Sequence, residues 1–131
     1  MTAPARFQKQ ERIVSQKLIE ELFGGGQSHS LAAFPLRAVY IQRERQDRQE
    51  PVEVLISVPK KRLHHAVDRN RAKRQVREAF RLQKQLLIEH IPQGQMIDIA
   101  FIWTADQPRL SAEVSKKVRS ILERIAKKFE V

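Results

Sequence analysis

The eight residues from Met96 to Trp103 read MIDIAFIW and carry one charged side chain, that of Asp98. A strand that faces water on one side alternates apolar and polar residues, whereas a strand covered on both faces is apolar nearly throughout. The run therefore predicts a central strand of a sheet. Asp98 is expected either to pair with a basic side chain or to lie at an edge, because an isolated buried carboxylate is costly.

Two further strands are predicted before this run. Residues 34–41 are apolar and β-prone, with Arg37 as the only charge. Residues 52–58 alternate, with valine or isoleucine at every second position, which is typical of a strand with one buried face. The polar segment 42–51 between them is interpreted as a solvated hairpin loop.

Three segments show the apolar spacing of amphipathic helices, namely residues 11–23, 66–89 and 111–129. With room for one more short strand, the predicted order of elements is αβββαβα. The fold class that follows is α+β, a two-layer α/β sandwich in which helices cover a small mixed sheet. The 131 residues suit one domain, 1–131, in which residues 1–10 read as a loose tail.

The positive charge of the chain is concentrated in one segment. The formal net charge is +10, and residues 60–84 contain ten basic and two acidic side chains, a net of +8. Six of these ten are arginines, whose planar guanidinium groups suit phosphate contacts. A focused patch favours a polyanionic partner, because binding releases condensed counterions. The alternative, a merely solvated helix face, is disfavoured by the clustering.

The predicted helix 66–89 separates this charge from its core side. One face carries an apolar stripe at helical spacing, formed by Ala72, Val76, Ala79, Phe80 and Leu87. Arg69, Lys73 and Arg77 follow at four-residue steps on another face, and Arg74 and Arg81 form a neighbouring row. The helix thus has one face for a core and one for phosphate.

The sequence lacks the residues that several kinds of catalytic or binding site need. The chain has no cysteine, which excludes disulfides, thiolate nucleophiles and cysteine zinc sites. No paired carboxylates or Ser/His/Asp arrangement is evident, and Gly24–Gly26 lack the Lys-Ser/Thr of a phosphate loop. No apolar run approaches the ~20 residues of a membrane span, and no signal-peptide core is present. We therefore expect a cytoplasmic protein without a membrane partner.

The stretch VDRNRAKRQVREAFR, residues 67–81, is the most specific part of the sequence. Its Arg69-Asn70-Arg71 core and the residues that follow resemble the signature helix of the bacterial ribonuclease P protein component. These following residues are Lys73-Arg74, Arg77 and Glu78-Ala79-Phe80-Arg81. The lead-in is similar as well, at Ser57, Val58, Lys60, Lys61, Ala66 and Val67. The resemblance extends over about residues 11–129, where the flanks match mainly in apolar pattern.

The resemblance implies a sandwich with an unusual left-handed βαβ crossover. It implies a non-catalytic protein subunit of the endoribonuclease ribonuclease P, in which the RNA subunit carries the active site. Mg²⁺ would be held by that RNA and the substrate, and no protein-bound cofactor or metal is expected. The implied partners are RNase P RNA and the single-stranded 5′ leader of precursor tRNA, whose removal matures the tRNA 5′ end. One monomeric protein would act with one RNA.

The resemblance also assigns roles to residues. Contacts with RNase P RNA fall to Arg69, Asn70, Arg71, Lys73, Arg74 and Arg77, preceded by Lys60 and Lys61. The leader-binding cleft falls to Tyr40, Ala38, Phe23 and Ile19, where aromatic rings would stack on unpaired bases. The chain departs from the family at Ile19, where a phenylalanine is usual, and in a lead-in that is one residue longer.

Other functions remain open at this point. A structural ribosomal RNA-binding protein is the main alternative, since it too is small and basic, although its charges are more often spread over the chain. A DNA-binding regulator would place the arginine helix in a major groove, and the strands argue against it. An autonomous metallonuclease needs an acidic cluster for Mg²⁺, which the sequence lacks.

Overall fold

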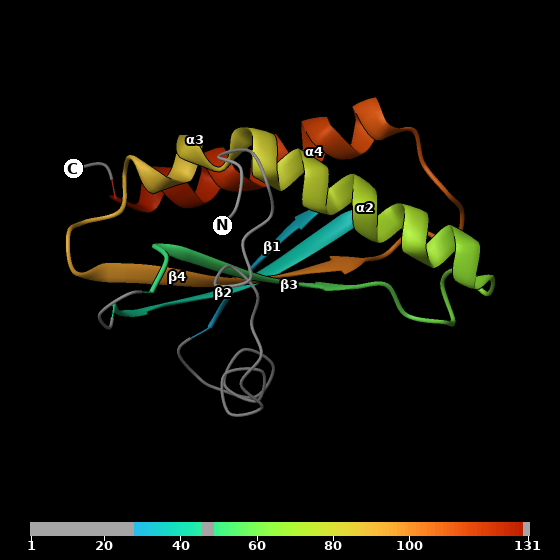
Figure 1. Ribbon diagram of the computed structural model, residues 1–131, viewed down its shortest axis with the longest axis horizontal. Helices are drawn as coiled ribbons and strands as arrows, with labels where there is room; N and C mark the ends of the chain where they lie inside the picture. Colours follow the sequence, from blue (N-terminus) through green and yellow to red (C-terminus); the bar gives the residue numbers. More distant parts are fainter. Residues whose placement is uncertain (1–27, 46–48, 130–131) are drawn as a thin grey trace, which may run out of the picture.

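A computed structural model of the chain describes residues 28–45 and 49–129 (Figure 1). The tail 1–10 and the predicted helix 11–23 lie outside the described residues. Strands β1 (His29–Ala33), β2 (Leu36–Glu44), β3 (Val52–Ser57) and β4 (Gln95–Trp103) form one sheet. Their spatial order is β1-β2-β4-β3.

Strand β4 occupies the central place that its apolar sequence predicts. It pairs antiparallel with β2 along one edge and parallel with β3 along the other. Every residue from Met96 to Phe101 is buried. The predicted mixed sheet with this strand at its centre is confirmed.

The interpretation of residues 42–51 as a hairpin loop is wrong. Strand β2 continues to Glu44, and β4 lies between β2 and β3, so the connection crosses from one side of β4 to the other. The physical reason is that β4 is apolar on both faces and takes a partner along each edge. The true hairpin joins β1 to β2, and its turn holds Phe34 and Pro35, which were predicted to begin a strand.

The helices that the structure describes lie together on one face of the sheet (Figure 1). They are α2 (Ala66–Gln83), α3 (Gln85–Ile88), α4 (Ser111–Ala126) and the short 3-10 helix η2 (Lys127–Phe129). The connection from β3 through α2 and α3 to β4 joins parallel neighbours, so it is a βαβ crossover. The predicted α+β class, with helices covering a small mixed sheet, is confirmed.

The single helix predicted over 66–89 is divided at Lys84. The amides of Leu87 and Ile88 both donate to the carbonyl oxygen of Lys84, at 3.1 and 3.0 Å, so the helical path tightens there. The short α3 that results places Leu87, which is fully buried, against the core. Gly94 then turns the chain into β4 with φ at +84°, a conformation that favours glycine.

The main core fills the space between the sheet and these helices. Alternation along β2 turns Leu36, Ala38 and Tyr40 toward it, and β4 contributes residues of the same face. The rings of Phe80 on α2 and Phe101 on β4 lie 6.3 Å apart, and both side chains are fully buried. Burying each such ring contributes about 2–3 kcal/mol, which fixes α2 across the sheet.

The opposite face of the sheet holds a buried group of charges. Asp98 is fully buried, and the guanidinium Nε of Arg43 lies 2.5 Å from its carboxylate. Glu53 is the register partner of Asp98 on β3, and its carboxylate lies 3.7 Å from Arg43. The prediction that Asp98 pairs with a basic side chain is confirmed, whereas an edge position is wrong because β4 is central.

This arrangement makes Glu53 lose its proton at a higher pH than an exposed glutamate does. Burial, followed by repulsion from Asp98, raises the pKa of Glu53 from its ordinary value of 4.5 to about 7, against the opposing effect of Arg43. Between these two values the folded protein binds a proton that the unfolded chain does not. The free energy of unfolding therefore falls as the pH rises from 4.5 to 7.

We expect Glu53→Gln to stabilise the protein at pH 8 by on the order of 2 kcal/mol, because the neutral amide removes the cost of ionisation. At pH 4.5 the difference from the unsubstituted protein should nearly vanish. Urea unfolding at both pH values measures it, with Glu44→Gln, an exposed carboxylate on β2, as the control. An equal effect at both pH values would contradict the assignment.

Candidate nucleic-acid interface

The loop that leads into α2 is held close to the sheet. The amides of Arg62 and Leu63 donate to the carbonyl oxygen of Pro59, at 3.0 and 3.3 Å, and the Leu63 side chain is buried in the core. His65 has an extended backbone at the N-cap position, and its carbonyl oxygen accepts the amide of Arg69. These contacts fix the path of the loop into α2. Lys60 and Lys61 stay exposed beside the start of the helix.

Arg69 has a local structural task. Its Nη1 donates to the carbonyl oxygens of Leu63 and His64, at 3.0 and 2.9 Å. The guanidinium thereby satisfies two backbone acceptors of the lead-in loop and joins that loop to the first turn of α2. Sequence periodicity placed Arg69 in one row with Lys73 and Arg77 but could not show this contact, which depends on the path of the loop.

The other predicted RNA contacts lie along the outer side of α2. Asn70, Arg71 and Arg74 are exposed, whereas Lys73 and Arg77 are half-buried at its flank. Among the residues that the structure describes, no carboxylate pairs with Arg71 or Arg74. We call these residues together with Arg69 the α2 basic face; it comprises Lys60, Lys61, Arg69, Asn70, Arg71, Lys73, Arg74 and Arg77.

The positive charge of α2 is partly neutralised in the turn that holds Glu78 and Arg81. Glu78 and Arg81 form an ion pair and hydrogen bonds at a spacing of three residues. The hydrogen bond from Arg81 lowers the pKa of Glu78, and the same contact raises the pKa of Arg81. The excess positive charge of α2 is thus greatest over its first three turns, where Arg71 and Arg74 lie.

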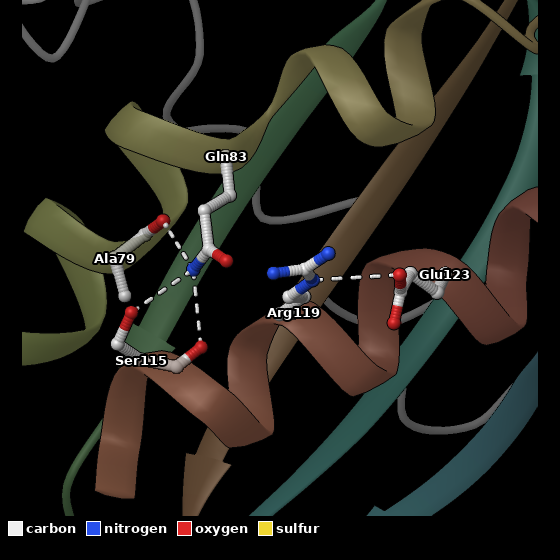
Figure 2. Close-up of polar contacts among 5 residues, drawn as sticks. All are labelled: Ala79, Gln83, Ser115, Arg119 and Glu123. Carbon is white, nitrogen blue, oxygen red and sulfur yellow. Dashed lines mark hydrogen bonds and ion pairs between the residues drawn. The ribbon is translucent and has the colours of Figure 1, made fainter. Parts of the chain in front are cut away.

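Two glutamines hold α2 against α4, and sequence reasoning did not single them out. Gln83 Nε2 donates to the carbonyl oxygen of Ala79 and to both oxygens of Ser115 on α4, at 3.0 to 3.2 Å (Figure 2). Gln75 Nε2 donates to the carbonyl oxygen of Arg109 and to Ser111 Oγ, at 2.8 and 3.0 Å. Both lie beside the apolar stripe, where periodicity gave no signal for a polar contact.

The two predicted leader-binding residues that the structure describes are buried and do not line an open cleft. Tyr40 and Ala38 share one face of β2, but their exposed fractions are 4% and 0%, and both belong to the core. Burial raises the pKa of the Tyr40 hydroxyl. The ring of exposed His29 lies 5.2 Å from the Tyr40 ring. Phe23 and Ile19 lie outside the described residues, so the leader contacts stay a prediction.

Two further properties concern membranes and metals. No helix within residues 28–45 and 49–129 is long and apolar enough to cross a membrane. In the same part of the chain, no three His, Asp or Glu side chains are grouped as metal ligands.

Comparison with known proteins identifies the family. The family model described as Ribonuclease P matches residues 7–126. The chain belongs to the ribonuclease P protein family. A ribonuclease P protein component of Porphyromonas gingivalis is 39% identical over 129 residues, which cover 96% of this chain and 92% of the relative. Membership connects the chain to an endoribonuclease complex, to RNase P RNA and to tRNA processing.

Solved structures of the family share the fold. A mutant RNase P protein of Staphylococcus aureus superposes with a TM-score of 0.69 at 25% identity, over 91% of this chain and 90% of the other. The RNase P protein of Thermotoga maritima gives a TM-score of 0.61 at 27% identity, over 88% and 97%. The resemblance inferred from the Arg69-Asn70-Arg71 segment is therefore confirmed at the level of family and fold.

The hydrogen bonds of Arg69 predict a stability difference within the signature. Arg69→Ala should lower the free energy of unfolding by about 1–2 kcal/mol, because two carbonyl oxygens lose a charged donor. Arg74→Ala, at an exposed position of the same helix, should change it by less than about 0.5 kcal/mol. Urea unfolding of the two variants measures the difference, and equal small effects would show that Arg69 does not stabilise the loop.

Proposed function

We propose that the α2 basic face binds the RNase P RNA and that the protein thereby assists removal of the 5′ leader from precursor tRNA. The observation that supports this is the concentration of cations along α2 and at its start, where Lys60, Lys61, Arg71 and Arg74 are exposed. Phosphates that meet such a face release condensed counterions, which gives affinity without sequence readout. The exposed amide of Asn70 adds a group that can donate to and accept from a base or sugar.

The packing of α2 supports a docking role. The inner side of the helix is fixed by the core and by Gln75 and Gln83, so the outer side keeps its spacing before and after binding. A preformed row loses less side-chain and backbone freedom on binding than a mobile segment does. Arg69 belongs to the proposed set because it also fixes the loop that carries Lys60 and Lys61.

The hydrolysis itself is assigned in this proposal to the RNA subunit. Mg²⁺ would be bound by RNA and substrate, and the protein would contribute affinity and orientation as a monomer with one RNA. Family membership supports this division of roles between protein and RNA, because the relatives of this chain are named as the protein component of ribonuclease P.

Replacing Arg71 and Arg74 together by alanine should weaken binding to a bacterial RNase P RNA by about 10- to 100-fold near physiological salt. The slope of log affinity against log salt should fall by about 2, because two phosphate contacts are lost. A control with the same charge change is Lys116→Ala with Lys128→Ala, two exposed cations elsewhere. Equal losses in both double variants would attribute binding to net charge and contradict a specific face.

We also propose that the 5′ leader contacts the sheet at Tyr40, and a conservative substitution of this core residue tests the contact. Tyr40→Leu keeps a buried apolar side chain but removes the aromatic face, so the holoenzyme should lose about tenfold in affinity for precursor tRNA. Its affinity for mature tRNA, which lacks the leader, should stay unchanged. An equal loss for both RNAs would contradict a leader contact at Tyr40.

A further inference from the structure

An exposed aromatic ring lies where β1 turns into β2. Phe34 is 53% exposed, and it is the one aromatic among the large hydrophobic side chains that are exposed in the described part of the chain. The phenylalanine, tyrosine and tryptophan rings elsewhere in the sheet and in α2 are buried in the core. Exposing a ring of this size leaves apolar area in water, which a partner could cover.

Arg109 covers one face of this ring. Its guanidinium carbon lies 4.7 Å from the centroid of the Phe34 ring, which is the geometry of a cation–π contact. The guanidinium also pairs with Glu113, whose carboxylate lies 3.3 Å from Nη1. The guanidinium thus lies over one face of the exposed ring. The residue after Arg109, Leu110, is 72% exposed and adds apolar surface.

Backbone contacts join the segments that carry Phe34 and Arg109. The amide of Thr104, at the start of the loop that carries Arg109, donates to the carbonyl oxygen of Pro35 at 2.8 Å. The end of this loop is joined to α2, because Gln75 donates to the carbonyl oxygen of Arg109 and to Ser111. The β1–β2 turn, the loop and α2 therefore form one continuous assembly.

The assembly adjoins the α2 basic face. Gln75 follows Arg74 directly and lies one helical turn after Arg71, so Arg71 and Gln75 are neighbours at the margin between the outer and inner sides of the helix. The lead-in loop meets the same connection, since Arg62 Nη1 lies 3.0 Å from the carboxylate of Asp106. An RNA strand held by Arg71 and Arg74 would continue toward Phe34 and Arg109.

We propose that Phe34 and Arg109 form a stacking platform for one unpaired base of the RNase P RNA. This inference rests on the proposed function. An aromatic ring backed by a guanidinium suits a nucleobase, because every base has a π face and the cation favours the adjacent phosphate. Continuity with the α2 basic face selects the RNA that this face binds.

The test measures affinity of the full-length protein for a bacterial RNase P RNA. Phe34→Ala and Phe34→Leu should each weaken binding about tenfold, because both lack a π face, whereas Phe34→Trp should bind at least as tightly as the unsubstituted protein. Leu82→Ala, at an exposed apolar position of α2, serves as the matched control and should leave affinity unchanged. Thermal unfolding of each variant confirms that the fold is intact.

The outcomes separate this inference from the function on which it rests. Failure of the unsubstituted protein to bind the RNA would overturn both. Tight binding by the unsubstituted protein and by Phe34→Ala would overturn the platform alone, as would equal affinities of the leucine and tryptophan variants. A photo-reactive phenylalanine at position 34 of the assembled holoenzyme should cross-link to RNase P RNA. Cross-linking only to bound precursor tRNA, or to neither RNA, would overturn the proposal.

Discussion

Strand β4 is hydrogen-bonded along both edges and packed on both faces, and the placement of the other described elements depends on this. Because β3 pairs with it in parallel, the chain between them must return along the sheet, and α2 with α3 makes this return. Because β2 pairs with it antiparallel on the other edge, β1 is left at the margin, and its turn brings Phe34 next to the loop that follows β4. The position of the basic helix is thus a consequence of where β4 lies.

The inner side of α2 stabilises the fold, whereas its outer side is available for binding. The inner side is held by Phe80 and its apolar neighbours and by the glutamine contacts with α4, which together resist displacement of the helix. The outer side contributes little to folding, since Arg71 and Arg74 are exposed and make no ion pair within the described residues. Side chains that are not needed for stability are available for a polyanion, and the fold keeps them at fixed spacing.

Sequence patterns predicted the strands and helices far better than they predicted which strands pair and which side chains make contact. The apolar run of β4 and the stripe of α2 were correct because burial on two faces, or on one helical side, leaves a direct periodic trace. The loop 42–51 was interpreted as a hairpin because pairing between strands leaves no such trace. The contact of Arg69 with Leu63 and His64, and the burial of Tyr40, depend on the loop path and on which face of β2 meets the helices. The cation–π contact of Phe34 with Arg109 joins residues far apart in sequence.

Cleavage of a precursor tRNA at low Mg²⁺ tests the proposed role of the protein most directly. A bacterial RNase P RNA alone, this protein alone and the two together would be compared for release of the 5′ leader. If the protein assists the catalytic RNA, leader release is stimulated only when both are present, and the protein alone is inactive. Cleavage by the protein alone would place the chemistry in this chain. No stimulation, while a ribonuclease P protein from another bacterium stimulates the same RNA, would contradict the proposed role of the protein.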